Sequence, residues 1–153
     1  PKQWSIGECL EHLNMVNAGY LSSMRSVIEK ARREKVTGTG PFAYGAIGRW
    51  FLKLNEPPVK RRFPAPKAFV PPSQLDRDEV VNRFTGQITE FIELARAADG
   101  LHLVKVKVAM PSMSFVRFPL GVTFLFAAAH VRRHLWQARN VRNEKAFPRP
   151  AQP

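Results

Sequence analysis

The apolar residues between Ile6 and Ala31 recur at steps of three and four, and this period constrains the fold more than any other feature of the sequence. Such spacing places the apolar side chains along one stripe of an α-helix. Ser5 and Glu8 match a capping box, in which each side chain accepts a hydrogen bond from the backbone N–H of the other residue. The sequence therefore predicts an amphipathic helix over residues 5–35.

Three further segments carry helical signals. Pro41 suits the first turn of a shorter helix over residues 41–54. Asp76 can cap a third helix, which is predicted over residues 76–100. A fourth helix is predicted over residues 119–143 from its apolar spacing.

The segment between the second and third helices is rich in proline, because residues 57–72 hold six of the 13 prolines. Proline lacks a backbone N–H, so this segment cannot be a helix or a central strand. Phe63, Phe69 and Val70 favour an extended segment pinned across the surface. Residues 101–108 alternate partly, but no partner strand is evident, so they are interpreted as a loop or extended chain. The predicted fold class is all-α.

The composition is that of a single globular domain. A chain of 153 residues with 44% hydrophobic content can bury a substantial core. We expect this domain over residues 1–147 and a frayed tail over residues 148–153. The one cysteine, Cys9, lies on the apolar stripe and is interpreted as a small buried hydrophobe. No intramolecular disulfide, secretory signal or membrane-spanning run is evident, which predicts a cytoplasmic protein.

The chain is basic, with 24 Lys and Arg residues against 12 Asp and Glu residues and a formal net charge of +12. Such a charge makes a nucleic-acid-binding protein one alternative. The cations are scattered, however, and no known nucleic-acid motif matches. We therefore expect no nucleic-acid partner, and this alternative stands third.

Two histidines, His130 and His134, are four residues apart on the last predicted helix, so both imidazoles lie on one face. They lie beside the apolar stripe, and His12 lies at the edge of the first helix's stripe. Two such flanks can meet at the mouth of a bundle, where a metal ion would keep access to water. The alternative is three solvent-facing or half-buried histidines with ordinary partners. His102 has no related spacing and is not a candidate.

Two sequence blocks resemble those of a known family. The segment WSIGECLEHL at residues 4–13 resembles the W-S-[IL]-x-E-x-[LI]-x-H-L block of the DinB/YfiT-like family. The segment AAHVRRHLWQARNV at residues 128–141 is similar to that family's C-terminal H-x-x-R-H-x-x-Q block. The basic, proline-containing stretch before the third helix is also similar to the connection found in some members.

The resemblance implies a four-helix bundle of the up-down-down-up type that binds a divalent transition metal, nickel or zinc. It implies that His12, His130 and His134 are the ligands and that a coordination position stays open. We then expect their ring nitrogens within about 5 Å of one another. The resemblance implies a further helix before the first block, and the sequence is expected to begin after it. A second chain, as in a homodimer, or a segment upstream is therefore expected to cover the apolar face formed by Ile6, Leu13, Tyr20 and Met24.

The resemblance also implies a metal-dependent thiol transferase or hydrolase that acts on a small molecule, with a low-molecular-weight thiol as partner. A non-enzymatic, stress-related metal-binding bundle is the second alternative. The catalytic residues are not determined by the sequence. The candidates are Glu8, Arg133 and Gln137, with helix capping, solvation and bundle packing as their respective structural interpretations. Trp50 and Phe115 are proposed to contact the substrate.

Overall fold

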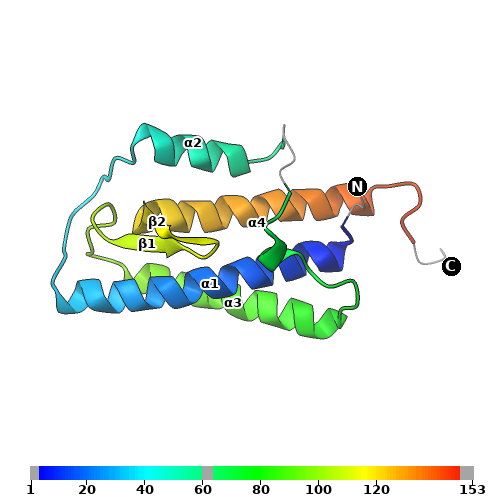
Figure 1. The fold of residues 1–153 in the computed structure, drawn as a ribbon, viewed down its shortest axis with the longest axis horizontal. Coiled ribbons are helices and arrows are strands. Elements are labelled where there is room, and N and C mark those ends of the chain that lie inside the picture. The colour runs from blue at the N-terminus through cyan, green and yellow to red at the C-terminus, as the bar shows by residue number, and fades with distance from the viewer. Residues whose placement is uncertain (1–3, 60–63, 149–153) are drawn as a thin grey trace.

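The computed structural model describes residues 4–59 and 64–148, and these form four α-helices, a short 3-10 helix and one β-hairpin (Figure 1). None of the helices in these ranges is long and apolar enough to cross a membrane. The elements are α1 (Ile6–Arg33), α2 (Ala46–Asn55), η1 (Lys67–Phe69), α3 (Arg77–Ala97), β1 (Lys107–Met110), β2 (Met113–Pro119) and α4 (Leu120–Arg142).

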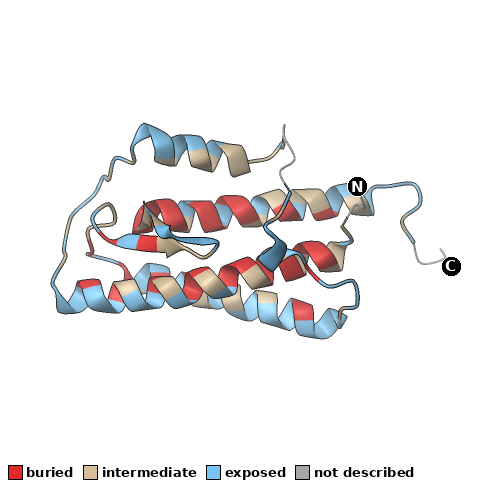
Figure 2. Cartoon of the chain, in the orientation of Figure 1, coloured by how far each residue is buried: buried red, intermediate tan, exposed pale blue. Residues whose placement is uncertain are grey.

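The long helix α1 is the centre of the molecule, since it packs against α3 on one side and α4 on the other. Its N-terminus has the predicted capping box, in which the Glu8 N–H donates to the Ser5 hydroxyl and the Ser5 N–H donates to the Glu8 carboxylate. Figure 2 shows the buried residues concentrated on α1 and on the inner side of α4. The apolar stripe predicted from the sequence is therefore the core of the fold.

The directions of the helices explain the long connection. α1 and α3 run the same way, and α4 runs opposite to both (Figure 1). A chain that leaves one helix and enters a parallel neighbour must return along the bundle, and residues 34–76 make this crossing. They include α2, which packs against α4, and η1, which packs against α1. Phe63 and the predicted tail beyond Pro148 lie outside the described residues.

The expectation that the apolar face of the first helix needs an outside partner was wrong for three of its four residues. Leu13, Tyr20 and Met24 are buried by the rest of this chain, and Ile6 is partly buried. These three side chains are buried because α3, α4 and the β-hairpin pack around α1. The face is therefore shielded from water without a second chain.

The interpretation of residues 101–108 as loop or extended chain without a partner was wrong at its two ends. Leu101 forms an isolated bridge with Thr37, and Lys107 and Val108 belong to β1, which pairs antiparallel with β2. The predicted helical bundle is therefore mostly helical with one small hairpin. The hairpin turn packs onto α1 at Gly19, where an added Cβ would lie 2.7 Å from Pro111, and it lacks the Asn-Gly type of turn signal.

The second helix begins later than predicted, at Ala46 and not near Pro41. Its N-cap residue, Gly45, provides no side-chain hydrogen bond. The preceding Tyr44 lies across the start of α4, and a Cβ on Gly121 would stand 1.8 Å from its hydroxyl. Packing of Tyr44 on α4 therefore keeps residues 41–45 out of the helix. The starts of α3 and α4, by contrast, lie within one residue of the predictions.

Met24 provides a test of this core. Its side chain is fully buried in the main hydrophobic cluster, and truncation to alanine leaves a cavity that neighbouring helices cannot fill. We expect Met24→Ala to lower the free energy of unfolding by about 2–5 kcal/mol. Ile47→Ala is the matched control, because Ile47 is exposed, and its effect should stay within about 0.5 kcal/mol. Urea unfolding measures both, and equal effects would contradict this description of the core.

Candidate metal centre

The three predicted ligands converge. His12 comes from α1, and His130 and His134 come from successive turns of α4, so the packing of α1 on α4 brings them together. One nitrogen of each ring lies within 4.8 Å of the others, which confirms the predicted proximity. The side chains are buried, with 5%, 8% and 6% of their residue surfaces exposed. The alternative of three solvent-facing or half-buried histidines is therefore wrong.

His12 is held in a single tautomer. Its Nδ1 atom lies 2.7 Å from the backbone carbonyl oxygen of Phe69, at the end of η1. A carbonyl oxygen can only accept a hydrogen bond, so Nδ1 carries the proton and Nε2 presents its lone pair. This is the usual way in which proteins orient a metal-binding imidazole. The proline-rich connection thus orients the His12 ring so that the Nε2 lone pair is available to an ion.

The geometry of His130 and His134 fits a shared ion. Their Nε2 atoms face each other at 3.1 Å. Two nitrogens bound to one tetrahedral ion at 2.0–2.1 Å would be separated by about 3.3 Å. Both buried Nδ1 atoms lack a hydrogen-bond partner among the described residues, and the amide of Gln137 interacts with the His134 ring. With His12, the residues present suit a divalent transition metal.

The environment keeps the three imidazoles neutral, as metal binding requires. Burial lowers the pKa of His130 to about 3 and that of His134 to about 2, and it lowers the pKa of His12 as well. The positive charge of Arg133 adds to each of these shifts, and the neighbouring histidines add to those of His130 and His134. Protons therefore compete poorly for these nitrogens at neutral pH.

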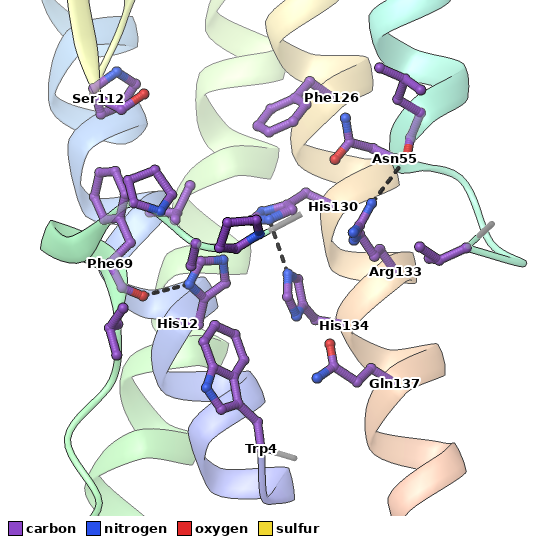
Figure 3. A pocket seen from close by; sticks show the side chains of 18 of the residues that line it. Trp4, His12, Asn55, Phe69, Ser112, Phe126, His130, Arg133, His134 and Gln137 are labelled. Carbon is purple, nitrogen blue, oxygen red and sulfur yellow. Dashed lines mark hydrogen bonds between the residues drawn. The ribbon is translucent and has the colours of Figure 1, made fainter. Parts of the chain in front are cut away.

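The cluster opens onto a cavity of about 830 Å³ between α1, α4, the end of α2 and the proline-rich connection (Figure 3). Such a volume accommodates a small molecule. Trp4 covers the cluster on one side, with its ring 4.9 Å from that of His12 and 6.1 Å from that of His134. Phe126 stacks on His130 at 5.2 Å on the other side. The imidazoles are thus shielded by aromatic rings but reachable through the cavity.

Two of the three candidate catalytic residues lie at the cavity, and the third does not. Arg133 and Gln137 line the cavity beside the histidines (Figure 3). Glu8 is not among the lining residues, and its carboxylate accepts a 2.7 Å hydrogen bond from the Ser5 backbone. Glu8 therefore caps helix α1, as its structural interpretation predicts.

The prediction that Trp50 and Phe115 contact the substrate was wrong. Trp50 is 62% exposed and Phe115 is 83% exposed, and neither lines the cavity. On α2 the helical period turns Phe51 toward the bundle and Trp50 away from it, and Phe51 stacks on Phe126 at 4.9 Å. The start of a helix decides which of two adjacent aromatic residues points inward, so no signal in the sequence distinguished them.

Two other residues have no part in the cluster. Cys9 is fully buried, and burial raises the pKa of its thiol to about 12, so it is a core residue as predicted. His102 lies against Phe42 and Gly38, away from the other histidines. Its exclusion from the candidate ligands agrees with the structure.

The comparison with known families agrees with this geometry. The described residues form a mostly helical bundle in which two helices contribute a buried cluster of three histidines. The model of the DinB superfamily matches residues 1–138, and the chain belongs to that superfamily. No curated protein and no solved structure is similar enough to count as a match. The predicted family is thereby confirmed.

The lowered pKa values predict how acid affects the metal-free protein. An unfolded histidine binds a proton below about pH 6.5, whereas the buried His130 and His134 stay neutral well below that pH. The unfolded state then binds more protons, so stability is present above about pH 6.5 and is lost as the pH falls. Between pH 7 and pH 5 we expect a loss of about 2 kcal/mol for each of these histidines.

Urea unfolding of metal-free protein at several pH values measures this loss. A double variant, His130→Gln with His134→Gln, removes both groups and should flatten the dependence between pH 7 and pH 5. The carboxylates are common to both proteins and cancel in the comparison. Identical pH profiles for the wild type and the double variant would contradict the burial of neutral imidazoles.

Proposed function

We propose that the protein is a metal-dependent enzyme in which His12, His130 and His134 hold a divalent ion, zinc or nickel, that activates a small thiol for transfer to an electrophile. The observation that carries this proposal is the opening of the histidine cluster onto a cavity. Within residues 4–59 and 64–148, no cysteine or carboxylate joins the cluster as a fourth ligand. Structural zinc sites use four protein ligands, whereas catalytic sites keep a position open.

The residues of the chain have distinct roles in this proposal. Phe69, through its carbonyl, holds the proton of His12 on Nδ1 and leaves Nε2 free. Trp4 and Phe126 keep water from two sides of the imidazoles. A bound divalent ion supplies the Lewis acidity that makes a thiol nucleophilic at neutral pH. None of the described lining residues is a carboxylate, so the proton of the thiol passes to solvent.

Three other functions are distinguishable. A metal-dependent hydrolase would use the same residues with water as the nucleophile. A non-enzymatic metal-binding bundle would retain the ion but bind no small molecule in the cavity. A nucleic-acid-binding protein would show affinity that falls steeply with salt. The cavity beside the histidines favours the thiol transferase and the hydrolase over the non-enzymatic bundle and the nucleic-acid-binding protein.

Metal retention tests the ligand set. The purified protein should hold about one zinc or nickel ion per chain. His130→Ala should weaken binding by more than the roughly 10- to 100-fold that is typical of losing an outer partner of a ligand. His102→Ala is the matched control, since His102 lies outside the cluster. Elemental analysis together with competition against a chelator measures both variants. Equal metal retention by wild type and His130→Ala would remove the proposed site.

Thiol binding tests the open position. Cobalt-substituted protein titrated with simple thiols should develop a sulfur-to-metal charge-transfer band in the near ultraviolet. The band should be absent in His134→Ala, which lacks one of the ligands. If fully metallated wild type shows no band with any thiol, the transferase assignment fails and the hydrolase becomes the function to test.

A further inference from the structure

The cavity beside the histidines has an unusual balance of charge. Of the described residues that line it, Arg133 carries the only full charge, and none is an aspartate or a glutamate. The remaining polar side chains are uncharged: three neutral imidazoles, two indoles, a serine hydroxyl, a tyrosine hydroxyl and the amides of Asn55, Gln137 and Asn140. Among the lining residues that the structure describes, the cavity therefore offers a single fixed cation to a ligand.

The guanidinium of Arg133 is positioned but not neutralised. Its Nη1 atom donates a 3.0 Å hydrogen bond to the backbone carbonyl of Leu54, in the last turn of α2. No ion pair joins Arg133 to an acidic residue in the described parts of the chain. The adjacent Arg132, by contrast, pairs with Glu56 on the surface. An arginine has five N–H donors, so most of those on Arg133 remain available.

Arg133 lies next to the histidine cluster, because it precedes His134 on α4 and lines the same cavity as His12, His130 and His134. A divalent ion on three neutral imidazoles would add two further positive charges to the same cavity. A negatively charged ligand removes this imbalance.

Much of the cavity lining is apolar. Val16, Tyr20, Phe51 and Phe126 form a floor between α1, α2 and α4. The rings are packed together, since Phe126 lies 4.9 Å from Phe51 and 5.5 Å from Tyr20. This floor suits a hydrocarbon or aromatic body. The single cation and the polar groups, together with this apolar floor, suit an amphipathic ligand.

We propose that the cavity binds a small amphipathic carboxylate, whose carboxylate group pairs with Arg133 while its apolar body lies on the floor formed by Val16, Tyr20, Phe51 and Phe126. The planar guanidinium presents two parallel N–H groups, which match the two oxygens of a carboxylate. This inference rests on the proposed function, because it names the class of thiol or electrophile that the metal centre would use.

The test compares two ligands that differ only in charge. The probes are 3-phenylpropionate and 3-phenylpropionamide, which share shape and size, and isothermal titration measures their dissociation constants on zinc-loaded and on metal-free protein. We expect the wild type to bind the acid about 10- to 100-fold more tightly than the amide, because hydrogen bonds to charged groups have that strength. Equal affinities for acid and amide would overturn the inference, as would the absence of binding by both.

Substitutions of Arg133 test whether this residue causes the preference for the acid over the amide. Arg133→Gln should abolish the preference for the acid and weaken binding of the amide far less than binding of the acid. Arg133→Lys keeps the charge but loses the paired N–H groups, so it should retain part of the preference. Arg139→Gln is the matched control, because Arg139 is an exposed arginine of α4 that does not line the cavity, and it should behave as the wild type. If Arg133→Gln weakens acid and amide equally, or Arg139→Gln has the larger effect, Arg133 is not the carboxylate site.

The two proposals fail in different ways. A preference for the acid in metal-free protein, without any thiol band in the cobalt form, would support the carboxylate site and refute the thiol transferase. Thiol bands without a preference for the acid would support the transferase and refute the carboxylate site. A circular dichroism melt of each variant confirms that it is folded before its affinity is compared.

Discussion

The packing of α1 against α4 is the contact on which the rest of the site depends. Neither helix carries a complete ligand set, since His12 lies on α1 and His130 and His134 lie on α4. Apolar contacts such as that of Tyr20 with Phe126, 5.5 Å apart, hold the two helices together. Burial of each such side chain contributes about 1.5–3 kcal/mol, which offsets the cost of taking the imidazoles out of water. The packing of the core therefore determines where the three histidines lie.

The long connection between α1 and α3 has a second role besides crossing the bundle. Its carbonyl at Phe69 fixes the proton of His12, and its prolines Pro64 and Pro66 form part of the cavity wall. Proline restricts the backbone, so such a segment can hold a carbonyl in place without regular secondary structure. At the other end of the cavity, α2 is held to α4 by hydrogen bonds from Arg132 to Glu56 and from Arg133 to the Leu54 carbonyl. The wall opposite α1 thus depends on both segments.

The sequence predicted what periodicity and local signals determine. The cap at Ser5, the stripe of α1 and the convergence of the three histidines followed from helical spacing and the family resemblance. It could not predict contacts made by the backbone or by pairs distant in the chain. The Phe69 carbonyl has no side-chain signal, and the hairpin was missed because β2 turns Phe115 outward and so lacks clean alternation. The pair of the buried Glu11 with Arg83 of α3, at 2.9 Å, is likewise a contact between distant residues that no local signal indicates.

X-ray absorption spectroscopy of the zinc- or nickel-loaded protein tests the central claim most directly, because it counts the atoms that bind the ion and identifies imidazole rings. The account predicts three imidazole nitrogens, from His12, His130 and His134, with zinc–nitrogen distances of about 2.0–2.1 Å, and a remaining position filled by water or another small ligand. In His12→Ala the imidazole count should fall to two. A sulfur ligand from Cys9, or an imidazole count that is unchanged in His12→Ala, would contradict the account.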